Sequence, residues 1–109
     1  MENCLFCKII VGEIPSEKVF ENEWVYGFKD ISPVAPVHIL LIPKKHIESI
    51  NDISEGDGKI LEEISYAAKK LSNGKDYRLV SNIGSEAGQS VFHLHFHLIS
   101  GRPLNWPPG

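Results

Sequence analysis

Apolar positions along this chain recur with two periods, and these periods separate one long helix from several short strands. Over residues 55–71, apolar side chains return every three or four positions, which is the spacing of one helix face. Ser54 is a suitable N-cap for this helix, and Asn73-Gly74 supplies a left-handed stop after it. The predicted apolar stripe consists of Ile60, Leu61, Ile64, Ala68 and Leu71.

Shorter apolar runs bounded by turn residues predict strands. These runs cover residues 18–20, 24–29, 37–42, 77–82 and 93–99. A short helix is predicted over residues 4–11, where Gly12 ends it. The order of these elements predicts one α+β domain over residues 1–109, with about five antiparallel strands and one main helix laid across them.

The last predicted strand carries an alternation of histidine and apolar residues. His93, His95 and His97 occupy every second position, and apolar residues fill the positions between them. Because successive side chains of a strand point to opposite faces, the three imidazoles are expected on one face. We expect the apolar face to anchor the strand to the core and the imidazole face to perform chemistry.

Three interpretations fit such a cluster of histidines. The rings could be partly buried and only hydrogen-bond, or they could share a zinc ion that keeps an open position. In the third, a neutral imidazole attacks a nucleotide phosphorus while its neighbours bind phosphate oxygens. The preceding segment, residues 84–90, holds two glycines, two serines and a glutamine. It could be an ordinary connection, but glycine lets backbone N–H groups approach an anion, which favours the third interpretation here.

Composition narrows the classes of partner. The net charge of −3 gives no basic surface for gripping long nucleic acid, so a small phosphate-bearing molecule is the better candidate. The longest apolar stretch, residues 37–43, is too short to span a bilayer. Residues 2 and 3 are Glu and Asn, where a signal peptide would be basic. We therefore expect a cytoplasmic protein that binds neither a membrane nor long nucleic acid.

Residues 88–99, Gly-Gln-Ser-Val-Phe-His-Leu-His-Phe-His-Leu-Ile, resemble the signature of the histidine triad (HIT) superfamily. Other segments are similar to its histidine-triad nucleotide-binding (HINT) branch. They are residues 4–10, 12–15, 30–33, His38, residues 42–46 and the ending Trp-Pro-Pro-Gly. The resemblance extends over essentially the whole chain, and it implies a HIT-like fold whose sheet continues across a homodimer.

HINT-like proteins are purine nucleoside phosphoramidases, which hydrolyse nucleotides with an amine on the α-phosphate, such as adenosine monophosphoramidate. The resemblance implies that His95 is the nucleophile and forms a nucleotidyl-histidine intermediate. His97 is then expected to contact the phosphate oxygens and His93 to support the orientation of His95. His38 matches a fourth histidine that backs the triad, and Ser90 matches a residue that helps the amine depart.

The resemblance also implies a set of nucleotide contacts. Asn82, Gly88, Gln89 and Ser90 are expected around the phosphate, and Asp30 is expected to hold the ribose hydroxyls. The apolar slot for the base would consist of Phe6, Ile9, Phe28, Ile31 and Leu40. In the family, two protomers pair through the main helix and the strand beside it, and Trp106 would reach the neighbouring active site.

Cys4 and Cys7 form a C-x-x-C pair near the start of the chain. No strand precedes the pair, which argues against a thioredoxin-like redox site, and a disulfide is disfavoured in the cytosol. Two interpretations stay open: a structural zinc site with His46 and His93 as the other ligands, or two buried thiols without metal. In either case the expected catalysis requires no cofactor.

Other functions remain compatible with these residues. A dinucleoside polyphosphate hydrolase is the alternative within the superfamily, although the Trp-Pro-Pro-Gly ending favours the HINT branch. A nucleotide-sensing regulatory module with incidental activity is a second alternative, and a hydrolase with a catalytic zinc is a third.

Overall fold

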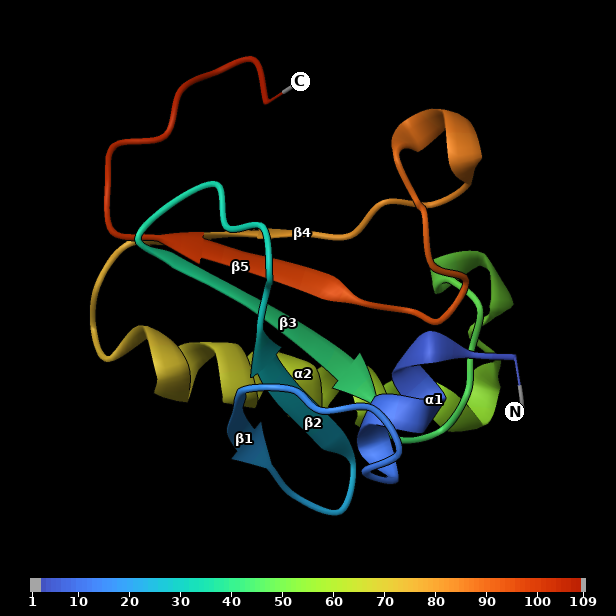
Figure 1. The fold of residues 1–109 in the computed structure, drawn as a ribbon. Coiled ribbons are helices and arrows are strands. Elements are labelled where there is room, and N and C mark those ends of the chain that lie inside the picture. Colours follow the sequence, from blue (N-terminus) through green and yellow to red (C-terminus); the bar gives the residue numbers. More distant parts are fainter. Residues whose placement is uncertain (1–2, 109) are drawn as a thin grey trace.

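The computed structural model describes residues 3–108 and is built around a five-stranded antiparallel sheet. The strand order is β1-β2-β3-β5-β4 (Figure 1). The strands are β1 (Lys18–Glu21), β2 (Val25–Lys29), β3 (Val37–Pro43), β4 (Tyr77–Val80) and β5 (Phe96–Ser100). With the short helix α1 (Leu5–Ile10) and the main helix α2 (Gly58–Ser72), this confirms the predicted α+β class.

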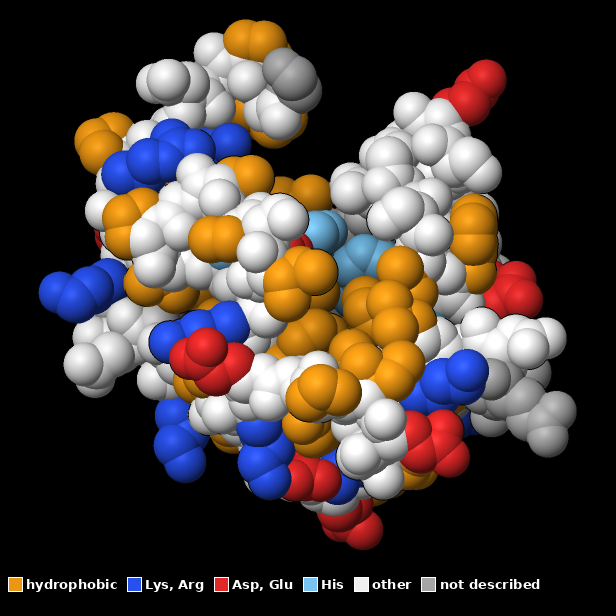
Figure 2. Space-filling view, viewed as in Figure 1, with side chains coloured by type: hydrophobic (Ala, Val, Ile, Leu, Met, Phe, Trp, Pro, Cys, Tyr) orange, Lys and Arg blue, Asp and Glu red, His pale blue; other side chains and the backbone are white. Residues whose placement is uncertain are grey.

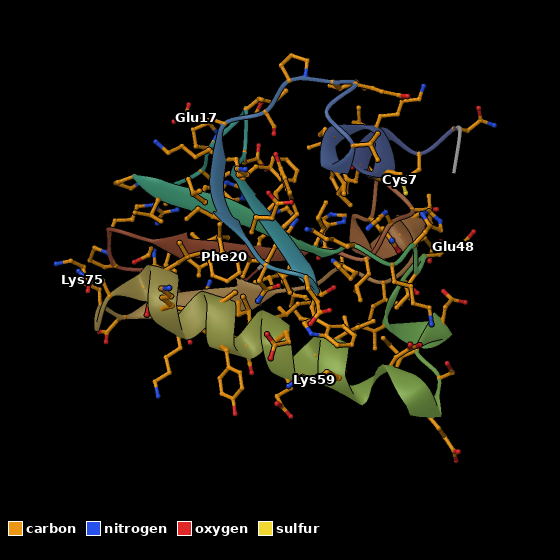
Figure 3. The ribbon with its side chains drawn as sticks, turned by 90° about the horizontal axis from the view of Figure 1, so that it is seen from below. Cys7, Glu17, Phe20, Glu48, Lys59 and Lys75 are labelled. Atoms are coloured by element: carbon orange, nitrogen blue, oxygen red, sulfur yellow. The ribbon has the colours of Figure 1, made fainter. Side chains whose placement is uncertain are left out.

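The central strand β3 is buried on both faces, which explains its continuous apolar sequence. Ile39 and Leu41 pack in the core cluster that α2 covers. Leu40 and Ile42 pack in a second cluster with residues of α1. Figure 3 shows α1 with Cys7 and α2 with Lys59 on opposite sides of the sheet. One face of the sheet is therefore covered by α2, whereas α1 lies on the other face.

The main helix begins later than the sequence pattern predicts. Residues Glu55–Asp57 form a 3-10 turn, and α2 starts at Gly58. Ser54 and Asp57 make a capping box, in which the Asp57 carboxylate accepts from the Ser54 N–H at 3.0 Å. Asn73 ends the helix in the left-handed conformation, as predicted, with a φ of 52°. Ile60, Ile64 and Ala68 of the stripe are buried, while Leu61 and Leu71 are half-buried.

The histidine strand is shorter than predicted, because β5 begins at Phe96. His93 and His95 therefore precede the regular strand. The reason is that the Leu94 N–H donates to the Ile47 carbonyl of the loop after β3, and the Ser81 hydroxyl donates to the His95 carbonyl. The alternation nevertheless persists, since Leu94 lies in the core beneath α2. The neighbouring strand β4 likewise ends at Val80, two residues before the predicted end.

Among residues 3–108, the helices are all too short or too polar to cross a bilayer.

Candidate active site

His95 is held by the main chain in one tautomer. Its Nδ1 lies 2.8 Å from the carbonyl oxygen of His93, and a carbonyl can only accept a hydrogen bond. Nδ1 must therefore carry the proton, which leaves the lone pair of the neutral ring on Nε2. The ring is only 6% exposed and packs edge-on against Phe6, with centroids 5.2 Å apart. In its neutral form, His95 thus presents a fixed Nε2 with a free lone pair, which is what a nucleophile requires.

His97 is oriented by a second chain of hydrogen bonds that starts at the backbone. The Val34 N–H donates to His38 Nδ1 at 3.1 Å, so the His38 proton is on Nε2. His38 Nε2 lies 2.9 Å from His97 Nδ1 and donates to it. The proton of neutral His97 is then on Nε2, which makes this nitrogen a hydrogen-bond donor for an anion. Burial, together with the nearby His95 and His38, lowers the pKa of His97 and keeps the ring neutral.

Asp30 follows β2 and lies beside this pair. Its Oδ1 accepts from the Ser32 N–H at 2.8 Å, and its Oδ2 lies 3.4 Å from His38 Nε2. The rings of His95 and His97 have centroids 5.2 Å apart. In Figure 2, histidine side chains lie in a depression between the C-terminal tail and the loop before β5, with apolar side chains beside them. Two imidazoles and a carboxylate therefore gather at one depression.

His93 faces away from this depression. It is fully buried, and its Nε2 donates to the Pro43 carbonyl at 2.8 Å. Its Nδ1 faces the sulfurs of Cys4 and Cys7, at 3.3 and 3.5 Å. Burial lowers the pKa of His93 to about 4, so the ring is neutral. The expected support of His95 comes from the His93 backbone carbonyl. The rings of His93 and His95 both pack against Phe6, so they lie on the same side of the chain, as predicted. The expectation that all three imidazoles perform chemistry is wrong, because the His93 ring is fully buried against the cysteines.

Cys4, Cys7, His46 and His93 form a compact cluster whose possible ligand atoms all lie within 4.8 Å of one another. Cys7 Sγ is 3.3 Å from His46 Nδ1. Zn–S bonds of about 2.3 Å and Zn–N bonds of about 2.0 Å place tetrahedral ligand atoms about 3.3–3.8 Å apart. The observed spacings match that range, and the Pro43 carbonyl fixes the His93 tautomer that a metal ligand needs. The donor set therefore fits a structural zinc ion.

The loop before β5 is braced by Gln89. The Gln89 side-chain amide donates to the carbonyls of Glu48 and Val91, at 2.6 and 3.1 Å, and its Oε1 accepts from the Gly84 N–H. The Gln89 backbone N–H donates to the Gly84 carbonyl. Every Gln89 N–H donates to a backbone carbonyl, of Glu48, Val91 or Gly84, so the expected place of Gln89 beside the phosphate stays a prediction. Its role here is to hold the shape of the loop.

Other residues of the loop remain available to a ligand. Ser90 is exposed, and among residues 3–108 its N–H and hydroxyl have no hydrogen-bond partner. Gly88 adopts a φ of 97° and lies against Asn82, whose Nδ2 would be 3.4 Å from an added Cβ. The loop thus brings Gly88 against Asn82, and the expected role of Asn82, Gly88 and Ser90 around a phosphate stays a prediction.

The expected base slot corresponds partly to a hollow of about 420 Å³. Ile9, Phe28, Asp30 and Ile31 are among its lining residues. Phe28 and Ile9 are buried, whereas Ile31 is 97% exposed and forms an open side. Phe6 and Leu40 belong to the buried cluster behind Phe28 and Ile9. Trp106 is 82% exposed in the C-terminal tail, so its expected role in a neighbouring site stays a prediction.

Sequence reasoning missed the groups that set the tautomers. The Val34 N–H and the carbonyls of His93 and Pro43 are main-chain atoms, so no residue type in the sequence signals them. Only the Pro that ends β3 and the turn before His38 mark where these groups lie.

Comparisons with known proteins agree with this arrangement. A family model described as the C-terminal binding region of the scavenger mRNA decapping enzyme matches residues 3–103. An uncharacterised HIT-like protein of Synechocystis is 46% identical over 112 residues, which cover 99% of this chain and 98% of that protein. The adenylylsulfatase HINT1 of Arabidopsis thaliana is 44% identical, over 96% of this chain and 76% of that protein.

Solved structures extend the agreement to three dimensions. The crystal structure of a HIT family hydrolase from Legionella pneumophila matches with a TM-score of 0.95 and 51% identity. The match covers 98% of this chain and 100% of the Legionella chain. Agreement in both sequence and fold over nearly the whole length shows that the chain belongs to the histidine triad superfamily.

Proposed function

We propose that this protein is a HINT-type hydrolase that cleaves the P–N bond of purine nucleoside 5'-phosphoramidates through a covalent nucleotidyl-His95 intermediate. One observation carries the proposal. His95 Nδ1 donates to the His93 carbonyl, which leaves Nε2 as the unprotonated nitrogen of a buried and fixed ring. A neutral imidazole with a free lone pair can attack phosphorus without a base to activate it.

The reaction takes two steps. His95 Nε2 bonds to the α-phosphorus while the P–N bond of the substrate breaks, and the leaving amine takes a proton from the Ser90 hydroxyl or from water. Water then attacks the same phosphorus and gives one proton back to the group that protonated the amine, while the bond between phosphorus and His95 Nε2 breaks. This step releases the nucleoside monophosphate and restores His95. In both steps His97 Nε2–H stabilises the negative phosphoryl oxygens. No step of this scheme uses a metal ion.

The rest of the depression accounts for the nucleotide. The hollow lined by Ile9 and Phe28 offers an apolar surface for a base, and Asp30 lies on its border as an acceptor for ribose hydroxyls. The Arabidopsis relative is named an adenylylsulfatase and the Legionella structure is titled a hydrolase. Both names support a hydrolase, and the Arabidopsis name also supports hydrolysis at an adenylyl phosphorus, where only the leaving group differs.

The test compares three leaving groups on one adenylyl group, each with and without EDTA. Purified protein is assayed with an adenosine phosphoramidate, adenylyl sulfate and a diadenosine polyphosphate. We expect the highest kcat/KM for the phosphoramidate and the same rate in EDTA. A higher kcat/KM for either other substrate would reassign the activity, EDTA-sensitive turnover would indicate a catalytic metal, and no turnover would indicate a binding module.

We also propose that Cys4, Cys7, His46 and His93 hold a structural zinc ion, because their spacing fits tetrahedral coordination. A bound zinc ion would cross-link α1, the segment after β3 and the segment before β5. Metal analysis of protein purified without chelator is expected to give about one zinc per chain. The Cys7→Ser variant is expected to lose it, and a metal-free wild-type protein would reject the site.

The homodimer is the third part of the proposal. Strand β4 lies at the edge of the sheet, and apolar side chains are exposed there and on α2. Tyr66, Tyr77 and Leu79 are 58%, 39% and 36% exposed. An open edge with apolar neighbours is suited to pairing with a second copy. Light scattering is expected to give twice the chain mass, and a monomer mass at assay concentration would contradict the dimer.

A further inference from the structure

Arg102 ties the C-terminal tail to the loop between β2 and β3. Its Nε and Nη2 both donate to the Val34 carbonyl, at 3.3 and 3.1 Å, while its Nη1 donates to the Pro103 carbonyl at 3.0 Å. The adjacent Gly101 has a φ of 97°, and a Cβ added there would lie 2.8 Å from the Pro36 Cβ. The tail therefore lies directly against the loop, with no room for a side chain between them.

Val34 connects this contact to the histidines. Its carbonyl accepts from Arg102, and its N–H donates to His38 Nδ1 at 3.1 Å. Val34 itself is 54% exposed and belongs to neither core cluster, so packing does little to fix its orientation. The two donors of the Arg102 guanidinium, Nε and Nη2, hold the Val34 carbonyl from across the loop.

We propose that Arg102 is a positioning residue for His97, acting through Val34 and His38. Arg102 holds the Val34 carbonyl and so restrains the backbone on both sides of the Val34 Cα. The Val34 N–H, in the preceding peptide group, keeps the His38 proton on Nε2, and His38 then keeps the His97 proton on the nitrogen that faces the phosphate. This inference rests on the proposed function, because His97 is taken to stabilise the phosphoryl oxygens of the reacting nucleotide.

The structure separates this effect from nucleoside binding. Asp30 is held by other contacts, since its N–H donates to the His38 carbonyl at 2.9 Å and its Oδ1 accepts from Ser32. The base-side residues Ile9 and Phe28 are buried in their own cluster. Loss of Arg102 is therefore expected to change the chemical step and to leave the affinity for the nucleoside part of the substrate unchanged.

Arg78 provides a matched control. It is also an arginine that binds the tail, through its Nη2 and the Asn105 carbonyl at 2.9 Å, but it makes no contact with Val34. We expect Arg102→Gln to lower kcat about fivefold, which corresponds to the loss of about one hydrogen bond of about 1 kcal/mol. The dissociation constant of adenosine, which lacks the phosphate that His97 contacts, is expected to change less than about twofold. The kcat of Arg102→Lys, which keeps one donor, is expected to lie between those of Arg102→Gln and wild type. The kcat of Arg78→Gln is expected to equal that of wild type.

The NMR chemical shifts of the histidine ring nitrogens report which nitrogen carries the proton. A loss of stability alone would not change them. In wild type, His38 is expected to show an acceptor-type Nδ1 and a protonated Nε2. In Arg102→Gln these signals are expected to move toward the average of the two tautomers, and in Arg78→Gln they are expected to stay. Unchanged His38 signals, an unchanged kcat, or equal effects of the two glutamine variants would each overturn the proposal. If wild type has no phosphoramidase activity, the proposed function fails, and the NMR comparison still decides whether Arg102 sets the His38 tautomer.

Discussion

Replacing His95 by alanine tests the proposed chemistry directly. The variant loses the only group that the scheme uses to attack phosphorus, while His97 keeps its bond to His38 at 2.9 Å and the hollow beside Phe28 keeps its lining. Water must then attack in one step without a covalent intermediate. We expect turnover of an adenosine phosphoramidate to fall by at least about 10³, which is about 4 kcal/mol of barrier. AMP affinity is expected to stay close to that of wild type.

Chemical rescue makes the test specific for the tautomer. The missing ring leaves a space beside Phe6 and His97, whose rings lie 5.2 Å from the His95 ring in each case. Free imidazole can donate one N–H to the His93 carbonyl and keep a lone pair for attack. 1-Methylimidazole has no N–H to donate, so its rescue is expected to be weaker. Near-normal turnover of His95→Ala would remove His95 from the nucleophile role, and equal rescue by both compounds would refute the tautomer argument.

Three further predictions concern stability. Asp57→Ala is expected to lower the free energy of unfolding by about 1 kcal/mol in urea titrations, because the capping contacts are lost. Hydrogen bonds from Lys45 and then Ser54 lower the pKa of Asp57 to about 2, so the difference between the variant and wild type should persist above pH 3.8 and shrink as pH falls from 3.8 to 2. Gly88→Ala should also destabilise, by about 1 kcal/mol or more, since alanine is strained at a φ of 97°; an unchanged urea midpoint would contradict this. The pKa of His97 is lower in the folded protein than in the unfolded chain. As the pH falls through about 6.5, His97 therefore becomes protonated in the unfolded chain but stays neutral in the folded protein. Wild type should therefore lose stability between about pH 7.5 and about pH 5.5, and His97→Gln should lose less; an equal loss would rule out His97 as a source.

The sequence predicts well those features that depend on side-chain type and spacing. The apolar stripe of α2, the Asn73 stop and the doubly buried strand β3 each follow from where apolar and turn residues lie. The boundaries are less predictable, because they depend on partners far along the chain. The strand that was expected to begin at His93 begins at Phe96, since the Leu94 N–H donates to the Ile47 carbonyl instead of to a neighbouring strand.

The candidate site shows the same division. The alternation of histidines predicts that His93 and His95 lie on the same side of the chain, where both rings pack against Phe6. Asp30, which the resemblance implies for the ribose, lies at the border of the hollow beside Phe28. The direction of His93 and the internal role of Gln89 could not be predicted, because both depend on backbone carbonyls supplied by other loops. Arg102 is unpredictable for the same reason, since its partner is the main chain of Val34.

Main-chain groups direct the protons of three histidine rings: the Val34 N–H for His38, the His93 carbonyl for His95 and the Pro43 carbonyl for His93. Peptide groups are unaffected by most amino-acid replacements that preserve the path of the backbone. The walls around the base can therefore diverge, or be redesigned for another nucleoside, without retuning the reactive nitrogen. In this architecture substrate preference and reactivity are encoded separately, and each is free to evolve without the other.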